Sequence, residues 1–270
     1  MDNIKEIIIP FEYLKIPTVL YKYRDWSDKY HKKLILELSI YLSAPSDFED
    51  PLDCKNPIRY DLLTDKEILD IYFNQSKNKN PEFSYHQHFQ WAWNWFLNSP
   101  LRDPIQRNEI ETNAAIEFNE RFGVFSLTAD PLNVSMWNKY SNQKKGFCVG
   151  YNSKLLFDFL GGGGEVIYCD NLPILKPFEE FVIQRHKQIF FKETKWNFEK
   201  EYRTHKFWPT RVTKIERNIL IPKECLNEVI FGPEIENNHR IEIEEFVNVN
   251  LPHVNMKNTK IENGEIIYCN

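Results

Sequence analysis

Two glutamates separated by one residue, Glu199 and Glu201, are the side chains of this sequence best suited to chemistry. They lie in the segment W-N-F-E-K-E-Y-R (196–203), whose alternation predicts a strand with both carboxylates on one face. Two carboxylates so close resist ionising together unless a cation or a ligand lies between them. An ordinary solvated strand face, neutralised by Lys200 and Arg203, explains the same pattern, so both readings stay open.

Other polar residues end or interrupt strand-like segments. Arg24 closes the pattern V-L-Y-K-Y-R, and Ser126 and Thr128 share one face of the segment F-G-V-F-S-L-T (122–128). A guanidinium is suited to hold a phosphate or carboxylate in a bidentate pair, and strand hydroxyls can both donate and accept hydrogen bonds.

The order of the predicted elements indicates the fold class. Strand patterns gather toward both ends of the chain and do not alternate regularly with helices, which predicts an α+β fold with a central, mostly antiparallel, twisted sheet and flanking helices. A mostly helical insertion is predicted at about 62–121, where Thr64 and Glu67 form a capping-box pattern. Four glycines at 161–164 predict a flexible turn, and we expect a single domain over residues 1–270.

Composition restricts the function classes. Of the 270 residues 42% are hydrophobic and 15% aromatic, which predicts a well-packed globular core. The net charge of -5 argues against a general nucleic-acid binder, since such proteins use an overall positive charge. A basic cluster between Lys187 and Lys206 suits a phosphate-bearing ligand or a solvated face.

Cysteine usage and hydropathy bear on the compartment. The five cysteines are odd in number and contain no C-x-x-C pair, so the sequence predicts neither a disulfide framework nor a zinc site. His86 and His88 have no further ligands nearby, and we predict no metal there. No signal-peptide pattern or long apolar run is present, so we expect a cytoplasmic protein without membrane contact.

Three segments carry a family resemblance. These are V-L-Y-K-Y-R with Y-L-S-A-P-S-D-F-E-D-P, then F-S-L-T-A-D-P-L-N-V-S-M-W-N-K-Y-S-N-Q-K-K-G-F-C-V-G-Y, and finally K-W-N-F-E-K-E-Y-R. Together they resemble the bacterial family named domain of unknown function 2971, over about residues 19–232. The chain departs from that pattern at Glu49, where Asn or Asp is common, and in the segment 83–97. This resemblance implies no activity by itself.

A second resemblance implies chemistry. The ADP-ribosyltransferase superfamily arranges its NAD site as an arginine on a first strand, a Ser-x-Ser or Ser-x-Thr on a middle strand and a Glu-x-Glu near a later strand. This chain is similar in offering Arg24, then Ser126 and Thr128, then Glu199 and Glu201, in that order. The resemblance implies an ADP-ribosyltransferase-like fold and an enzyme that uses NAD as a substrate, with an unknown protein or nucleic-acid acceptor.

The same resemblance implies a role for each residue. Arg24, with Tyr23 beside it, would hold the NAD pyrophosphate, and the two hydroxyls would fix the ribose. Glu201 would stabilise the oxocarbenium-like state formed when the bond to nicotinamide breaks, and Glu199 would orient or deprotonate the acceptor. Enzymes of this kind include NAD glycohydrolases, and the resemblance extends to toxins and phage-defence effectors.

Two other functions fit the sequence. A non-catalytic binding module would use the aromatic clusters at 91–95 and 137–140 against a partner. A metal-dependent nuclease would use the acidic loop at 45–53, with candidate magnesium ligands and supporting residues Asp47, Glu49, Asp50, Asp53, Glu193 and Lys195. The prolines that flank this loop argue instead for an ordinary turn-rich segment.

Overall fold

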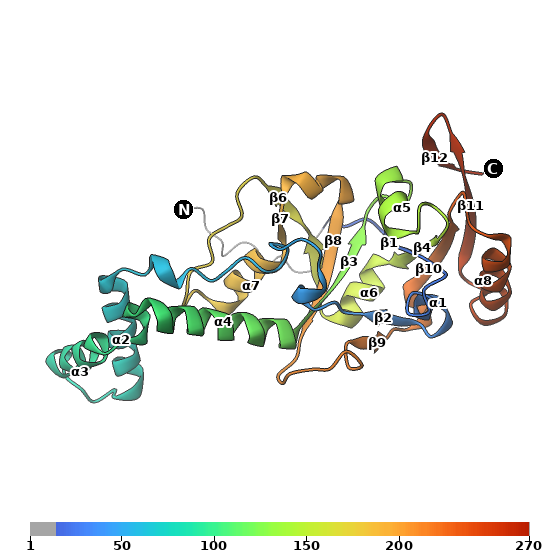
Figure 1. Ribbon diagram of the computed structural model, residues 1–270. Helices are drawn as coiled ribbons and strands as arrows, with labels where there is room; N and C mark the ends of the chain where they lie inside the picture. The colour runs from blue at the N-terminus through green and yellow to red at the C-terminus, as the bar shows by residue number, and fades with distance from the viewer. Residues whose placement is uncertain (1–14, 270) are drawn as a thin grey trace. The chain divides into compact units, whose positions relative to one another are not determined.

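The computed structural model describes residues 15–269 (Figure 1). Its contacts divide the chain into two compact units, and each is described by itself. Among the described residues, unit 1 comprises 15–54, 119–172 and 189–269, and unit 2 comprises 55–118 and 173–188. Within the described residues, no helix combines the length and the apolar character that a membrane crossing requires.

An eight-stranded sheet forms the centre of unit 1, in the order β12-β11-β10-β4-β1-β3-β8-β5. Neighbouring strands are antiparallel except β10 and β11, which are parallel. The predicted α+β class with a mostly antiparallel sheet is therefore confirmed. The strands are β1 (Val19–Arg24), β3 (Phe122–Thr128), β4 (Phe147–Asn152), β5 (Gly163–Glu165), β8 (Glu201–Phe207), β10 (Leu226–Phe231), β11 (Asn255–Glu262) and β12 (Glu265–Tyr268).

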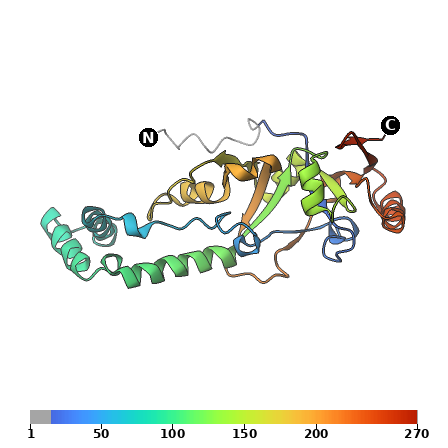
Figure 2. The ribbon, with the colours of Figure 1, turned by 45° about the horizontal axis from the view of Figure 1, so that its top comes forward.

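Helices and two small sheets surround this sheet within unit 1. The helices are α1 (Lys33–Leu36), α5 (Val134–Tyr140), α6 (Ser153–Leu160) and α8 (Asn237–Asn250). The small sheets pair β2 (Ser39–Tyr41) with β9 (Asn218–Leu220) and β6 (Ile167–Cys169) with β7 (Phe191–Glu193). Both ribbon views show α8, β11 and β12 together at one end of the sheet (Figures 1 and 2).

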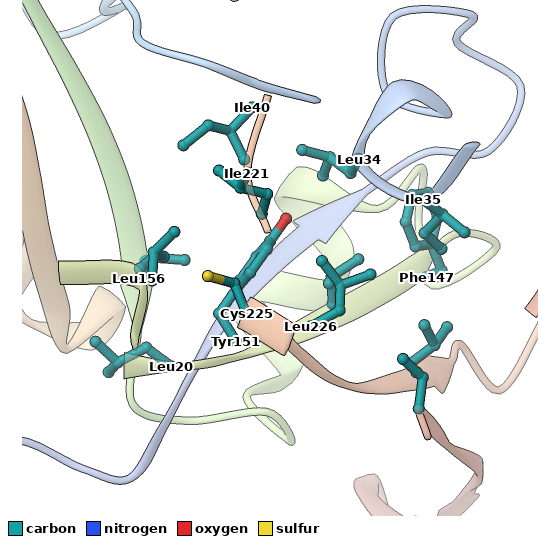
Figure 3. Packing of buried hydrophobic residues seen from close by; sticks show 14 of the residues in the cluster. Leu20, Leu34, Ile35, Ile40, Phe147, Tyr151, Leu156, Ile221, Cys225 and Leu226 are labelled. Carbon is teal, nitrogen blue, oxygen red and sulfur yellow. The ribbon is translucent and has the colours of Figure 1, made fainter. Parts of the chain in front are cut away.

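The main hydrophobic core lies against one face of the sheet. Figure 3 shows Tyr151 of β4 among side chains from β1, α6 and the segment around β10, including Leu20, Leu156 and Leu226. All four are almost completely buried. Burying a side chain of this size contributes about 1.5–3 kcal/mol, so the sheet that carries the site rests on a well-packed base.

Unit 2 contains the predicted helical segment. Its helices are α2 (Asp65–Lys79), α3 (Tyr85–Leu97), α4 (Pro104–Arg121, which enters unit 1) and α7 (Phe181–Ile189, which also crosses the boundary). The capping box at the start of α2 is confirmed, since Thr64 and Glu67 bond each other's backbone N–H groups. Ser84 and Gln87 repeat the same arrangement at α3.

Two local predictions need correction. The segment 196–203 is not one strand, because η6 (Thr194–Glu199) is a 3₁₀ helix and Lys200 has a left-handed φ of 43° before β8 begins at Glu201. Only the first part of the glycine segment 161–164 forms a turn. Gly161 ends α6 with a φ of 93°, whereas Gly163 and Gly164 belong to strand β5, which pairs with β8.

Candidate functional site

A cavity of about 240 Å³ opens in unit 1 beside β1, β3 and the start of β8. Its walls come from those strands, from α5, from η6 and from the acidic loop after β2. The lining residues are charged, aromatic or hydroxyl-bearing for the most part: Tyr21, Lys22, Tyr23, Arg24, Ser43, Asp47, Phe48, Glu49, Asp50, Asp53, Ser126, Leu127, Met136, Lys139, Tyr140, Lys192, Trp196, Glu199 and Glu201.

Lys192 lies at the centre of three carboxylates. Its Nζ atom is 2.6 Å from Glu199, 3.0 Å from Glu201 and 3.1 Å from Asp53. An ammonium has three N–H donors, so this set of neighbours satisfies the lysine completely. Lys192 thus provides the cation that two neighbouring glutamates need if both are to be ionised.

Arg203 forms a second buried cation behind Lys192. Its guanidinium pairs with Glu201 at 2.7 and 2.9 Å and with Asp53 at 2.8 Å. The remaining nitrogen donates to the Ile189 carbonyl at 2.6 Å and to the Cys54 sulfur at 3.2 Å. All five donors are therefore used, and because the side chain is 0% exposed, Arg203 anchors the site and does not face a ligand.

Backbone geometry brings these groups together. In β8, Glu201 and Arg203 are two residues apart and share one face, which permits their bidentate pair. Lys192 points inward from the short strand β7. The left-handed turn at Lys200 ends η6 and returns the chain into β8, so Glu199 reaches the same ammonium from a different element.

Tyr140 holds the other oxygen of Glu199. Its hydroxyl donates to Glu199 Oε1 at 2.6 Å from the last residue of α5. Asn133 caps this helix through Met136, and Trp137 packs edge-on against Tyr23 at 4.9 Å, which fixes the orientation of the helix. Burial and the neighbouring Glu199 raise the pKa of Tyr140, so its phenol stays protonated and remains a donor.

The ionisation of the network follows from its contacts. Burial would raise the pKa of Glu201, but Arg203 and Lys192 outweigh it and lower that pKa below the ordinary 4.5. Burial would lower the pKa of Lys192, but Glu201 and Asp53 raise it above the ordinary 10.5. Glu201 is therefore an anion and Lys192 a cation throughout the neutral range.

Two further basic side chains, Lys22 and Arg24, line the cavity without a carboxylate partner among the described residues. Lys22 Nζ donates to the Ser126 carbonyl at 2.6 Å and lies 5.0 Å from the centre of the Phe125 ring. Arg24 donates to the Tyr23 carbonyl at 3.1 Å. Lys139, in contrast, pairs with Glu49 at 3.7 Å. Lys22 and Arg24 are two residues apart on β1 and project from the same face.

The three hydroxyl-bearing candidates, Ser126, Thr128 and Tyr23, differ in their position relative to the cavity and in their hydrogen-bond partners. The Ser126 hydroxyl is buried at the cavity and completes no hydrogen bond within residues 15–269, although it is close enough to Glu201 to help lower the pKa of that carboxyl. Thr128 is 0% exposed, does not line the cavity and accepts a bond from the Asp130 amide at 3.2 Å. Tyr23 lines the cavity, but its hydroxyl already donates to the Asp130 carbonyl.

The structure thus brings five of the sequence candidates to one cavity and leaves the sixth in the sheet. The five are Arg24, Tyr23, Ser126, Glu199 and Glu201, and the sixth is Thr128. Sequence reasoning missed the roles of Lys22 and Tyr140 and placed Lys192 only in a general basic cluster. Their signal was weak, since a single lysine or tyrosine in a strand or a short helix has no distinctive spacing.

The acidic loop also reaches this cavity, but its carboxylates have protein partners. Asp53 pairs with Lys192 and Arg203, Asp50 accepts from the Trp196 indole, and Asp47 accepts from the Ala44 amide. Glu193 pairs with Lys195 outside the cavity lining. Within residues 15–269, no three His, Cys, Asp or Glu side chains are grouped as a metal ion would need.

The comparisons with known proteins add no family. No family model matches the chain, and no curated protein or solved structure matches it significantly. Both resemblances of the sequence segments therefore stay predictions, and the geometry of the cavity carries the functional argument.

Proposed function

We propose that this protein cleaves the N-glycosidic bond of NAD, as an NAD glycohydrolase or an ADP-ribosyltransferase. The observation that carries the proposal is the meeting of Arg24, Ser126, Glu199 and Glu201 at one cavity. Within the described part of the chain, the cavity combines a guanidinium without a carboxylate partner, a buried hydroxyl without a completed hydrogen bond and two carboxylates held in place.

Each group has a role in the reaction. Arg24 binds the pyrophosphate, and the Ser126 hydroxyl bonds the nicotinamide ribose. Glu201, kept anionic by Arg203 and Lys192, stabilises the positive charge that develops on the ribose as its bond to nicotinamide breaks. Water or an acceptor then attacks the anomeric carbon. With water the products are nicotinamide, ADP-ribose and a proton.

Preorganisation is the physical advantage of this site. The carboxylates of Glu199 and Glu201 are fixed by Tyr140, Lys192 and Arg203, so they need not reorient as charge develops. Glu199 is the residue that orients the attacking group in this proposal. Thr128, although an initial candidate, has no role in it.

The cellular setting is part of the same proposal. The five cysteines of the chain are free, as suits a reducing compartment, and NAD is supplied in the cytoplasm. An enzyme that consumes NAD there would deplete the cell's cofactor, which is the action of a toxin or a phage-defence effector.

Nicotinamide release from NAD is the decisive measurement. The wild-type protein is incubated with NAD in the presence of EDTA, with and without a mixture of proteins and nucleic acids as acceptors. Release above the uncatalysed rate supports the proposal. Glu201→Gln should reduce it by about 100-fold or more, and Ser126→Ala should reduce it while the protein stays folded, because that hydroxyl completes no hydrogen bond within residues 15–269.

A matched control guards against a general effect of losing a carboxylate. Glu193→Gln removes a glutamate that forms an ion pair near the site but does not line the cavity, so turnover should be unchanged. Absence of nicotinamide release from the folded wild-type protein in every condition would overturn the proposal.

A binding module is the second candidate, supported by a different observation in unit 2. Helix α3 exposes a row of aromatic side chains, with Tyr85, Phe89, Trp93 and Trp95 between 40% and 75% exposed. Such residues are enriched at protein interfaces. Two results together would favour this function. The folded wild-type protein would show no NAD turnover, and the Trp93→Ala variant would no longer bind a partner that the wild-type protein retains.

A further inference from the structure

We propose that Lys22 is a nucleophilic amine that forms an imine with a small carbonyl compound bearing an anionic group. This activity is separate from the cleavage of NAD and does not depend on the two glutamates. The proposal rests on the position of Lys22 in the cavity and on the groups that Lys22 contacts.

Lys22 differs from the other lysines of the cavity in its contacts. Lys192 is surrounded by three carboxylates and Lys139 is paired with Glu49. Lys22 has no carboxylate within ion-pair distance among the described residues, and its polar contact is the backbone carbonyl of Ser126 at 2.6 Å. A carbonyl accepts a hydrogen bond from a neutral amine as well as from an ammonium, so this contact does not require the charge.

The surroundings favour the neutral amine. Burial is the largest influence and lowers the pKa of Lys22 well below 10.5, and the neighbouring Arg24 lowers it further. Lys192 acts in the same direction. The anions Glu199 and Glu201 raise the pKa of Lys22, but both are paired with Lys192 or Arg203, and the net direction stays downward. Burial next to a second cation is one of the known ways to activate a lysine.

Lys22 is accessible from the cavity, and Arg24 lies where it can orient a ligand. Lys22 is partly exposed and lines the cavity, so a small molecule can reach the amine. Arg24 projects from the same face of β1, and its guanidinium has no carboxylate partner in the described part of the chain. A carbonyl compound with a phosphate or carboxylate group would bind Arg24 and present its carbonyl carbon to the amine.

The reaction is balanced without a further reagent. The lone pair of Nζ attacks the carbonyl carbon, and the carbonyl oxygen takes up a proton to give a carbinolamine. That first proton comes from the amine nitrogen. The carbinolamine then loses its hydroxyl group together with the second N–H proton as water, and the C=N bond forms. A hydride donor such as borohydride reduces this bond and makes the adduct permanent.

Pyridoxal 5′-phosphate is a suitable probe, because it combines an aldehyde with a phosphate and its imine absorbs light. The wild-type protein is treated with the probe, reduced with borohydride at neutral pH and mapped by mass spectrometry of its peptides. We expect one main adduct, on Lys22. Lys22→Arg should abolish it, and Lys139→Arg, the matched change in the same cavity, should retain it.

Two further measurements test the details. Arg24→Gln should weaken labelling by pyridoxal 5′-phosphate about tenfold more than it weakens labelling by pyridoxal, because only the phosphate loses an interaction of about 1.4 kcal/mol, whereas the effect of Arg24 on the pKa of Lys22 is common to both probes. The labelling rate of Lys22 should level off well below pH 10. Adducts spread over exposed lysines with Lys22 unmodified, or a rate that rises tenfold per pH unit up to pH 10 as for an ordinary lysine, would overturn the proposal.

The outcome is independent of NAD turnover. The probe contains no N-glycosidic bond, and wild-type mapping needs no variant that has to fold. Labelling of Lys22 without nicotinamide release would support this inference and not the proposed glycosidic chemistry, and the reverse result would do the opposite.

Discussion

Arg203 holds Glu201 in a bidentate ion pair, with Nε 2.7 Å from Oε1 and the second terminal nitrogen 2.9 Å from Oε2. Both residues lie in β8, two positions apart, and both are almost fully buried. This pair fixes the carboxylate that we place at the reacting ribose. It also makes Arg203 a support of the site, since no donor remains for a ligand.

Removal of Arg203 should destabilise the protein. Arg203→Leu leaves Glu201 and Asp53 buried with Lys192 as their remaining cation, and breaking a buried pair in this way costs about 3–5 kcal/mol. The free energy of unfolding in urea measures the loss. Arg211→Leu, which removes an exposed pair with Glu120, should change it by less than about 1 kcal/mol. A loss for Arg203→Leu as small as that of the control would contradict this account.

Acid should weaken the contribution of Glu201. Its folded pKa lies below its ordinary value of 4.5, so the carboxylate stabilises the fold above pH 4.5 and loses this effect as pH falls further. The gap in unfolding free energy between wild type and Glu201→Gln should therefore be constant from neutral pH to about 4.5 and then shrink, by at most about 1.4 kcal/mol per pH unit. Urea unfolding of both proteins over this range is the measurement, and a gap that widens in acid would refute it.

Loss of the Tyr140 hydroxyl should affect turnover more than folding. Tyr140→Phe frees one oxygen of Glu199 and should lower kcat for NAD cleavage by about tenfold, with KM little changed, since about 1.4 kcal/mol of orientation is lost. Tyr41→Phe is the matched control, because that hydroxyl also bonds a carboxylate, Asp47, but Tyr41 does not line the cavity. Equal effects of the two changes would remove Tyr140 from the site.

The capping box of α2 can be tested within unit 2. Thr64→Ala removes the hydroxyl that accepts from the Glu67 amide and should cost about 1 kcal/mol of local stability. Hydrogen exchange of the amides in the first turns of α2 should accelerate accordingly. Exchange in α3, which has its own capping box at Ser84, is the internal reference. Unchanged exchange in α2 would show that tertiary packing, and not the cap, holds the helix start.

The sequence by itself determined the features that depend on local chemistry. The capping box at Thr64 and Glu67 follows from side chains three residues apart, and the helices of the segment 62–121 follow from periodic apolar residues. The alternation in β3 placed Ser126 at the surface of the sheet, where it meets the cavity. Such features need only neighbours along the chain.

The tertiary structure decided the rest, because the remaining contacts join distant residues. The alternation at 196–199 predicted a strand, but the Trp196 indole bonds Asp50, a residue 146 positions away, and the segment folds as a 3₁₀ helix. The two glutamates meet because Lys192 reaches them from β7. Lys192 is a paired cation, whereas Lys22 is an amine without a carboxylate partner among residues 15–269. Which of the two a lysine becomes depends on the carboxylates that the fold brings near, and residue spacing does not specify that.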